Sequence, residues 1–358
     1  MTEALSLAGD YLLQHARNER SGRTDLTALN RDHYEAFDEA IRKEHQYNGW
    51  FTERYVRKAL GAIAVMLDRK QLTTWAEGYP TLPVSQDKSR TVGVVMAGNI
   101  PLVGFHDMLS VITSGHRFLG KPSSKDDRLL KHIADVIIAL EPGFSDRIRF
   151  TDGYLKEVDA IIATGSDNSA RYFEYYFRNK PHIIRKNRNG IAILSGNEPE
   201  HELLKLGEDI FTYFGLGCRN VTKIYVPEDY DLTLFMKALE QFSEVSQHNK
   251  YNNNLDYNRS VYMMNGIPFL DNGILLLKED PGLASPPGVV FYEKYSQLEN
   301  VIEQIAAFRD KIQCVVTSIS GIDHAIPPGT SQVPGLRDYA DGIDTMEFLT
   351  GISNSDGI

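Results

Sequence analysis

The segment TVGVVMAGNIP, residues 91–101, contains one complete strand-to-helix passage of this chain. Residues 92–97 form a short continuous apolar run, which is typical of a buried parallel strand. Residues 98–101 form a turn, and Pro101 suits the first turn of a helix, which we expect to run to about Ser114. The segment therefore predicts a strand, a tight turn and a helix in succession.

The alternation of strands and helices continues after this segment. We expect strands at residues 117–120, 158–163 and 182–185, and a helix at residues 126–140. This order predicts a parallel sheet with right-handed crossovers. In such sheets, ligands bind beyond the carboxyl ends of the strands.

Two turns are expected at those carboxyl ends. Gly98 and Asn99 follow the first strand, and Gly165 and Ser166 follow the strand at residues 158–163. Each turn precedes a helix whose N-terminus offers N–H groups and a partial positive charge, which together favour phosphate. The fingerprints GxGxxG and GxxxxGK[ST] are absent, so the phosphate argument depends on having two such turns.

Other residues around these turns allow two interpretations. Lys121 ends a strand at the same edge and could pair with a phosphate or a ribose hydroxyl, or could be a solvated lysine at a strand end. The helix after Ser166 has an aromatic stripe, which we interpret as core packing rather than as a ligand site. The stripe consists of Ala170, Phe173, Tyr176 and Phe177.

A second run of strands and helices begins after Arg185. We expect strands at residues 191–194, 221–226, 289–292 and 314–317. A helix with one apolar face precedes the second of these strands. That face consists of Leu203, Leu206, Ile210, Phe211 and Phe214.

Cys218 lies between this helix and the strand that follows, in the loop GLGCRN at residues 215–220. Gly215 and Gly217 allow a tight turn and the close approach of a substrate carbonyl. Arg219 can favour the thiolate, which is the nucleophilic form of cysteine. Cys218 is therefore a candidate nucleophile, and the alternative is a small buried hydrophobic residue.

The two ends of the chain differ from this pattern. Residues 1–90 read as helical, because Val56, Leu60, Ile63 and Leu67 repeat on one helix face. Residues 326–348 are rich in Pro and Gly and read as an extended arm. We therefore expect three parts: a helical region with a dinucleotide-binding domain at 1–185, a catalytic domain at 186–325, and an arm at 326–358 that packs back or mediates oligomerisation.

Composition restricts the class of protein. The 358 residues are 42% hydrophobic and 24% charged, as in soluble globular proteins. A net charge of −10 argues against a nucleic-acid partner. No apolar run is long enough to span a membrane, and the N-terminus lacks a signal-peptide pattern. Because there are only two cysteines, we expect a reducing cytoplasm, and we expect no metal site.

Several of these segments, in this order, resemble motifs of the aldehyde dehydrogenase superfamily. They are AGNIP at 97–101, SGH at 114–116, KPS at 121–123, ATGS at 163–166 and GLGC at 215–218. Within that superfamily, almost the whole chain resembles the LuxC-type long-chain acyl-CoA reductases. The segments that carry this second resemblance are NGWFT at 48–52, VVMAGNIP at 94–101, FTYFGLGCRNV at 211–221 and PGLRDYA at 334–340.

The resemblance implies an α/β fold of the aldehyde dehydrogenase type, with a Rossmann-type cofactor domain and a smaller α/β catalytic domain. It implies that Cys218 is the nucleophile. The Asn99 side-chain amide and the Cys218 backbone N–H would then stabilise the tetrahedral oxyanion.

The chain departs from the family pattern in two places. Hydrolytic members have a Glu-Leu-Gly-Gly-Lys segment whose glutamate activates water, whereas residues 185–190 here read RKNRNG, without a carboxylate. NAD-preferring members commonly have a glutamate after Lys-Pro-Ser, whereas Ser124 and Lys125 stand here, which suits the 2′-phosphate of NADPH. The expected cofactor contacts are Gly98, Lys121, Ser123, Ser124, Lys125, Gly165 and Ser166.

The expected function is the NADPH-dependent reduction of a long-chain acyl-CoA, or of an acyl group on a protein donor, to the aldehyde. An aldehyde dehydrogenase that makes acid is one alternative, for which Glu208 is a weak candidate base. A non-enzymatic acyl-carrying subunit is the other. His248 could act as an acid or base, or could be a surface histidine. The chain could also form a homo-oligomer.

Overall fold

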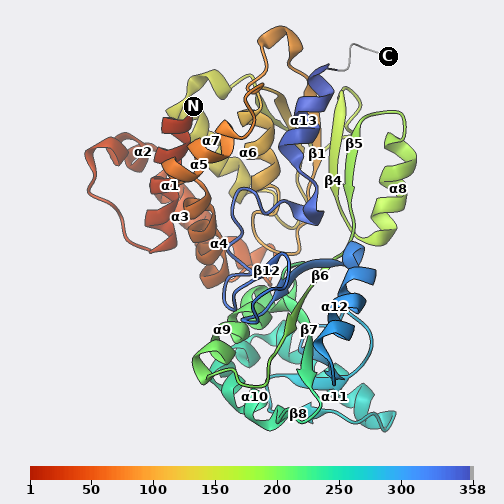
Figure 1. The fold of residues 1–358 in the computed structure, drawn as a ribbon. Coiled ribbons are helices and arrows are strands. Elements are labelled where there is room, and N and C mark those ends of the chain that lie inside the picture. Colours follow the sequence, from red (N-terminus) through yellow and green to blue (C-terminus); the bar gives the residue numbers. More distant parts are fainter. Residues whose placement is uncertain (355–358) are drawn as a thin grey trace. The chain divides into compact units, whose positions relative to one another are not determined.

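The computed structural model describes residues 1–354, and the chain divides into two compact units. Unit 1 consists of Met1–Lys186 together with the chain from Pro334 onward, and unit 2 is Asn187–Val333. Figure 1 shows the chain entering unit 2 once and returning to unit 1 in its last, blue part. No helix among the described residues is long and apolar enough to cross a membrane.

Unit 1 begins with the helices expected from the sequence. They are α1 (Thr2–Ala16), α2 (Thr27–Asp32), α3 (Tyr34–Lys43), α4 (Glu53–Met66) and α5 (Arg69–Glu77), with short 3-10 turns at Thr24–Leu26, Glu44–Gln46 and Gln86–Lys88. The predicted face of α4 is confirmed, because Val56, Leu60, Ile63 and Leu67 are all buried. Thr52 caps α4 by accepting a hydrogen bond from the Tyr55 N–H.

The first sheet is parallel, with the order β3-β2-β1-β4-β5. Its strands are β1 (Thr91–Val95), β2 (Arg117–Lys121), β3 (Ile148–Phe150), β4 (Ala160–Thr164) and β5 (His182–Arg185). Its helices are α6 (Phe105–Thr113), α7 (Leu129–Leu140) and α8 (Asp167–Phe177), with a 3-10 turn at Pro142–Phe144. The strand β3 has three residues and was missed by the sequence analysis, since a strand that short has no periodic signal.

Helix α6 starts later than the sequence predicts. The expected start was Pro101, but residues 101–104 form turns and the helix begins at Phe105. The reason is Leu102, whose φ of 65° is left-handed and cannot belong to a right-handed helix.

The connection from β3 to β4 has no helix. Residues 151–159 link the two strands as turns and bends, although β2 and β1 lie between β3 and β4 in the sheet. Leu155 and Val158 on this connection are buried against Ile161 of β4. A Cβ placed on Gly93 of β1 would lie 2.9–3.1 Å from these three side chains, so the crossing needs glycine there.

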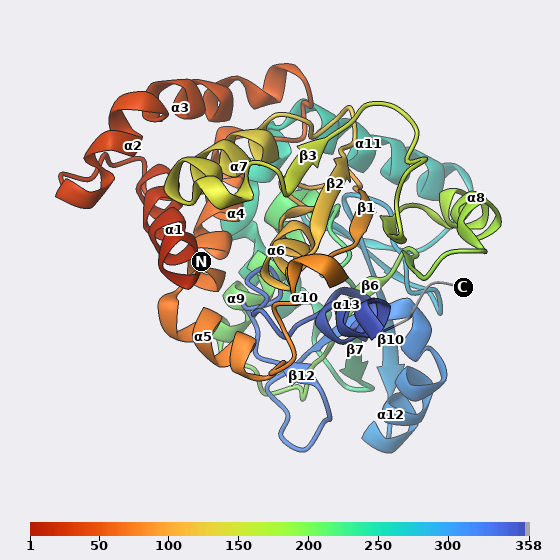
Figure 2. The same ribbon diagram turned by 90° about the horizontal axis from the view of Figure 1, so that it is seen from above.

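The aromatic stripe of α8 is only partly in the core. Phe173 and Phe177 pack on the sheet with Leu155 and Val158, as predicted, but Tyr176 is 71% exposed. The prediction that Tyr176 is a core residue is therefore wrong. In both ribbon views α8 lies on the opposite side of unit 1 from α1 and α2 (Figures 1 and 2).

The tail is less extended than the sequence predicts. Residues 345–354 form a helix, α13 (Thr345–Asn354), preceded by a 3-10 turn at Ala340–Gly342. Tyr339 fastens the tail to α5: its hydroxyl accepts a hydrogen bond from Trp75 Nε1 at 2.7 Å and lies 2.7 Å from the Tyr79 hydroxyl. Leu349 of α13 is fully buried, which a solvated arm would not be.

Unit 2 contains a seven-stranded sheet with the order β12-β11-β6-β7-β10-β9-β8. All neighbouring strands are parallel except β8 and β9. The strands are β6 (Asn189–Ile193), β7 (Val221–Pro227), β8 (Leu270–Asp271), β9 (Leu276–Glu279), β10 (Val289–Tyr295), β11 (Ile312–Val316) and β12 (Ala325–Ile326). The helices are α9 (Glu200–Phe211), α10 (Leu232–Leu239), α11 (Asn249–Met264) and α12 (Leu298–Ala307), with 3-10 segments at Thr212–Gly215, Glu240–Gln247 and Arg309–Lys311.

Candidate functional site

Cys218 lies at the end of a sharply turned loop in unit 2. Helix α9 ends at Phe211, earlier than the face through Phe214 predicts. Tyr213 (φ 53°), Phe214 (φ 58°) and Gly215 (φ 77°) then adopt three successive left-handed conformations. For a side chain larger than glycine this costs about 1–2 kcal/mol per residue, so the surrounding contacts must hold the turn. The Cys218 side chain is exposed, whereas Cys314 is buried.

Asn220 holds this loop from beneath. Its side chain is fully buried. Its Oδ1 accepts a hydrogen bond from the Gly217 N–H at 2.8 Å. Its Nδ2 donates to the Asp209 and Thr212 carbonyls at 2.8 Å, and to the Ile210 carbonyl at 3.3 Å. One amide therefore ties the residue before Cys218 to the last carbonyls of α9, which have no partner inside the helix.

A second anchor joins this loop to the segment after β12. The buried Asp209 carboxylate accepts the backbone N–H groups of Gly329 at 2.6 Å and Ser331 at 3.0 Å. Arg219 Nε donates to the Ser331 carbonyl at 2.6 Å. The Arg219 guanidinium therefore makes a structural hydrogen bond, and its effect on the Cys218 thiol stays a prediction.

Cys314 contacts the same loop from the sheet. Its Sγ lies 3.6 Å from the Arg219 carbonyl oxygen, to which it donates a weak hydrogen bond. The exposed Cys218 and the buried Cys314 therefore both lie next to Arg219.

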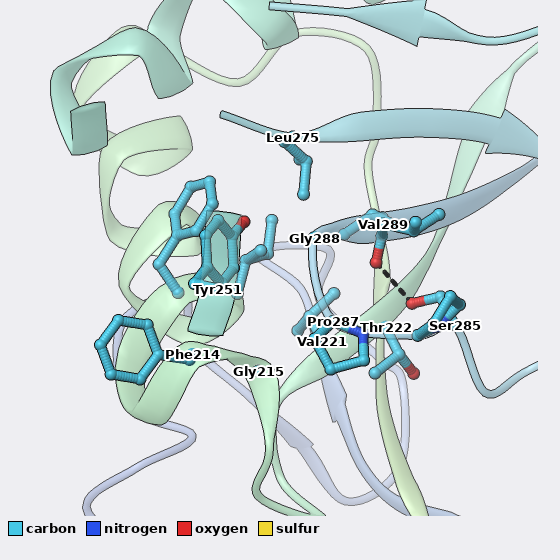
Figure 3. Close-up of a pocket in the computed structure, with 14 residues that line it drawn as sticks. Phe214, Gly215, Val221, Thr222, Tyr251, Leu275, Ser285, Pro287, Gly288 and Val289 are labelled. Atoms are coloured by element: carbon cyan, nitrogen blue, oxygen red, sulfur yellow. Dashed lines mark hydrogen bonds between the residues drawn. The ribbon is translucent and has the colours of Figure 1, made fainter. Parts of the chain in front are cut away.

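An apolar pocket lies behind the turn that precedes Cys218. It is small and partly open to solvent. Figure 3 shows Phe214 and Tyr251 on one side, and Pro287, Gly288 and Val289 on the other.

His248 supports this turn from outside. It is half-buried, not a fully exposed surface histidine. Its ring stacks on Phe214 with a centroid distance of 4.1 Å. Its Nδ1 accepts the Tyr251 N–H at 3.4 Å and caps α11. A δ nitrogen that accepts a hydrogen bond is unprotonated, so this contact favours the tautomer with hydrogen on Nε2.

The candidate cofactor residues lie in unit 1, at the carboxyl ends of β1, β2 and β4. Gly98 and Asn99 follow β1, and residues 121–125 end β2 and begin its loop. A Cβ on Gly98 would lie 2.6 Å from Ser123 Oγ, so these two loops touch. Ser124 and Lys125 are exposed.

The loop after β4 forms a helix N-terminus. Ser166 is the N-cap of α8, and its Oγ accepts the Ser169 N–H at 3.3 Å. A Cβ on Gly165 would lie 2.9 Å from Ser169 Cβ, so only glycine fits without a shift.

Lys121 is not simply a solvated lysine. Its Nζ donates to the Gly153 carbonyl at 2.9 Å and lies 5.5 Å from the centroid of the Tyr154 ring, a side chain that is 84% exposed. The donor set of this edge is a helix N-terminus, hydroxyls and two lysines. This set fits the phosphates of a nicotinamide dinucleotide.

Residues 185–190, in which the resemblance implies that the hydrolytic motif is missing, are structural in part. Arg185 is buried and pairs with Asp107 Oδ2 at 2.7 Å, and it donates to Thr345 Oγ1 at 3.0 Å. Arg188 donates to the carbonyls of Arg309 and Ile312. Glu208, the alternative base, is half-buried on α9, with Thr212 Oγ1 at 3.4 Å from its carboxylate.

The fold of this chain has counterparts among solved structures. It is similar to aldehyde dehydrogenase 21 from Physcomitrella patens, solved with the reaction product succinate, at a TM-score of 0.64 and 12% identity over 99% of this chain and 84% of that one. The chain has the aldehyde dehydrogenase fold. The NAD-dependent aldehyde dehydrogenase from Sinorhizobium meliloti matches with a TM-score of 0.60 and 13% identity, over 90% of this chain and 71% of that one.

A third aldehyde dehydrogenase, from Bacillus cereus in complex with NAD⁺, matches with a TM-score of 0.55 and 15% identity, over 88% of this chain and 77% of that one. No family model and no curated protein matches the chain. The fold class expected from the sequence is thus confirmed.

The residues predicted from the sequence include the exposed Cys218 but not the buried side chains that hold its loop. Asn220 and Asp209 were not selected, although an asparagine beside two glycines can bond neighbouring backbone groups and so hold a turn. Asn99 belongs to unit 1 and Cys218 to unit 2.

Proposed function

We propose that this protein is an NADPH-dependent reductase of acyl thioesters, with a long-chain acyl-CoA or an acyl-protein as donor. The observation that carries the proposal is the exposed Cys218 thiol at the end of a left-handed turn held by Asn220. Such a loop presents a nucleophile without burying it, which covalent acyl transfer requires.

Cys218 begins the reaction as a thiolate. Its sulfur attacks the thioester carbonyl carbon, forming a C–S bond, and the tetrahedral oxyanion then expels the donor thiolate, which takes up a proton. The product is an acyl group on Cys218. We assign the Asn99 amide and the Cys218 backbone N–H as oxyanion donors, each contributing about 3 kcal/mol to the transition state.

The second half-reaction needs a reductant. Bound NADPH would supply a hydride to the acyl carbon, and the Cys218 thiolate leaves as the aldehyde forms. The residues that would hold this cofactor are Gly98, Lys121, Ser123, Ser124, Lys125, Gly165 and Ser166. Lys125 and Ser124, both exposed, support a preference for the 2′-phosphate.

The lack of a carboxylate at residues 185–190 supports reduction over hydrolysis. A positioned general base contributes about 10²–10⁴-fold to the rate at which water attacks an acyl-enzyme. Without that base, the acyl group on Cys218 should persist until hydride or a thiol removes it.

The test is intact-protein mass spectrometry with a panel of acyl-CoAs, followed by addition of NADPH. We expect an acyl adduct on Cys218 that hydrolyses slowly and is discharged as aldehyde by NADPH. Rapid conversion to free acid would instead favour an aldehyde dehydrogenase with Glu208 or His248 as base. A stable adduct with no response to NADPH and no NADPH binding would identify a non-enzymatic acyl carrier.

Cofactor choice has its own test. The ratio of kcat/KM for NADPH to that for NADH should exceed one, and Ser124→Glu should reverse the preference by placing a carboxylate where the 2′-phosphate would bind. Equal values for both cofactors in the unaltered protein would overturn the NADPH assignment.

A further inference from the structure

The loops after β1 and β2 are fastened to one another in unit 1. The Met96 N–H donates to the Lys121 carbonyl at 3.1 Å, and Gly98 packs directly on Ser123. Asn48 adds long contacts of 3.4 Å from its Nδ2 to the carbonyls of both Gly98 and Lys125. The turn that contains Asn99 therefore rests on the loop that contains Ser124.

Asp126 makes the strongest link between these two loops. Its carboxylate is 6% exposed, and Oδ2 accepts the Leu102 N–H at 2.7 Å. Its own N–H donates to the Ser123 carbonyl at 2.9 Å, which closes the second loop. Asp126 Oδ1 is buried and has no hydrogen-bond partner among the described residues.

The bond to Leu102 falls where the backbone is strained. Leu102 has a φ of 65°, which costs a leucine about 1–2 kcal/mol relative to a right-handed or extended conformation. A hydrogen bond from a buried amide to a carboxylate contributes about 1.5–3 kcal/mol, enough to hold that conformation. Among the described residues, the acceptor of the Leu102 N–H is the Asp126 carboxylate, so Asp126 holds this turn.

We propose that Asp126 is a positioning residue that holds the Gly98–Leu102 turn, and with it the Asn99 amide, in the conformation that catalysis needs. The inference rests on the proposed function for its catalytic part. The structural part of the inference, that Asp126 holds the Leu102 amide, is independent of the proposed function.

The charges around Asp126 add a pH dependence. Burial raises the pKa of Asp126 to about 7, and the nearby Glu44 and Asp127 carboxylates raise it as well, while the Leu102 N–H and Arg128 lower it. Arg128 is itself bonded to Glu44 at 2.8 and 3.2 Å. The anionic form of Asp126 accepts the stronger hydrogen bond. The turn should therefore be more stable above pH 7 than below it.

The test compares two substitutions of similar size. Asp126→Asn retains an acceptor oxygen and loses the charge, whereas Asp126→Leu loses both. Asp127→Asn is the matched control, because Asp127 is a half-buried neighbour without a bond to the turn. Hydrogen exchange of the Leu102 amide, thermal melting, and kcat and KM from pH 5.5 to 8.5 are measured for each folded variant.

We expect Asp126→Leu to speed Leu102 exchange at least tenfold and to lower kcat about 10–100-fold, with KM for acyl-CoA little changed. Asp126→Asn should stay within about threefold of wild type at pH 7 and lose the rise of kcat through pH 7. Asp127→Asn should match wild type in Leu102 exchange and in kcat above pH 7, and should only move the rise of kcat to lower pH, because it removes one carboxylate that raises the pKa of Asp126.

Unchanged Leu102 exchange in Asp126→Leu would overturn the inference, and so would a pH profile that Asp126→Asn leaves intact. If wild-type protein neither binds NADPH nor reduces a thioester, the proposed function fails, and with it the catalytic part of the inference. The exchange measurement then still decides whether Asp126 holds the turn.

Discussion

Cys218 and Cys314 flank the Arg219 peptide but should differ completely in function. Cys218→Ser should abolish adduct formation and aldehyde production, since a serine hydroxyl stays protonated without a base. Cys314→Ser should retain activity within about threefold, because a hydroxyl can still donate to the Arg219 carbonyl, now held by Sγ at 3.6 Å. Peptide mapping after incubation with acyl-CoA identifies the labelled cysteine, and label on Cys314 alone would refute the assignment.

Asn220 should be needed both for stability and for the reactivity of Cys218. Asn220→Asp can still accept the Gly217 N–H but cannot donate to the three carbonyls of α9 and the following turn. We expect a loss of about 2–4 kcal/mol in the free energy of unfolding, from buried groups left unpaired.

In the same variant, the rate at which iodoacetamide alkylates Cys218 should differ from the wild-type rate, because the loop shifts. Asn197→Asp, at an exposed loop position, is the control and should change neither measurement. An Asn220→Asp protein with wild-type stability and wild-type alkylation would show that the loop is held by other contacts.

His15 should make the protein acid-sensitive. Its ring is fully buried among Tyr11, Tyr34 and Phe37, and neither ring nitrogen has a hydrogen-bond partner among the described residues; Asp38 Oδ1 is 3.9 Å from Nδ1, too far for one. Burial lowers the pKa of His15 to about 4, below its unfolded value of about 6.5.

The unfolded chain therefore binds a proton between pH 6.5 and pH 4 that the folded chain rejects. Stability contributed by neutral His15 is present above pH 6.5 and is lost as the pH falls toward 4, by about 3 kcal/mol in all. His15→Phe should flatten part of this slope in urea titrations, and His45→Gln, at an exposed histidine, should not. A slope that His15→Phe leaves unchanged would assign the effect to other buried histidines, such as His116.

At the scale of elements, Arg185 joins three parts of unit 1. It lies on β5, pairs with Asp107 of α6 and donates to Thr345 at the start of α13. Arg185→Met leaves a buried carboxylate without its cation and should lower the free energy of unfolding by about 3–5 kcal/mol. The double variant Arg185→Met, Asp107→Leu should recover much of that loss.

The neighbouring pair Lys186–Glu174 is the matched control, because both side chains are about half exposed. Lys186→Met should cost under about 1 kcal/mol. Equal losses for Arg185→Met and Lys186→Met in denaturant titrations would refute the role given to burial.

The sequence predicts elements where a local pattern and the fold agree. The apolar runs of β1, β4 and β5 and the face of α4 follow from their own residues. The loop with Cys218 was selected because its glycines allow a tight turn beside the thiol and Arg219 can favour the thiolate. The start of α6 could not be predicted, since it is set by a contact between Leu102 and Asp126, 24 residues apart. Tyr176 was misassigned because periodicity alone does not separate a buried aromatic from an exposed one. The α13 helix was missed because the Pro and Gly residues before it led to the prediction of an extended arm.

At the scale of the whole molecule, unit 1 is discontinuous in sequence and unit 2 is continuous. The tail completes unit 1 through buried contacts: His116 Nε2 lies 3.0 Å from the Leu349 carbonyl, and His106 Nε2 lies 3.0 Å from the Leu336 carbonyl. We therefore expect residues 187–333, expressed alone, to give dispersed NMR spectra, and residues 1–186 to remain partly folded until residues 334–354 are supplied. A cooperative thermal transition for residues 1–186 alone would contradict this.

The same topology sets an order of events during synthesis. Residues 1–186 leave the ribosome first, but the groups on α5 and α6 that the tail contacts stay exposed until the ribosome has also made all of unit 2. At about 5–20 residues per second, that interval lasts on the order of 10–30 s, during which a nascent chain with open apolar surface is a target for chaperones and for aggregation. Slow translation of unit 2 should therefore lower the yield of folded protein, because unit 1 stays incomplete for longer.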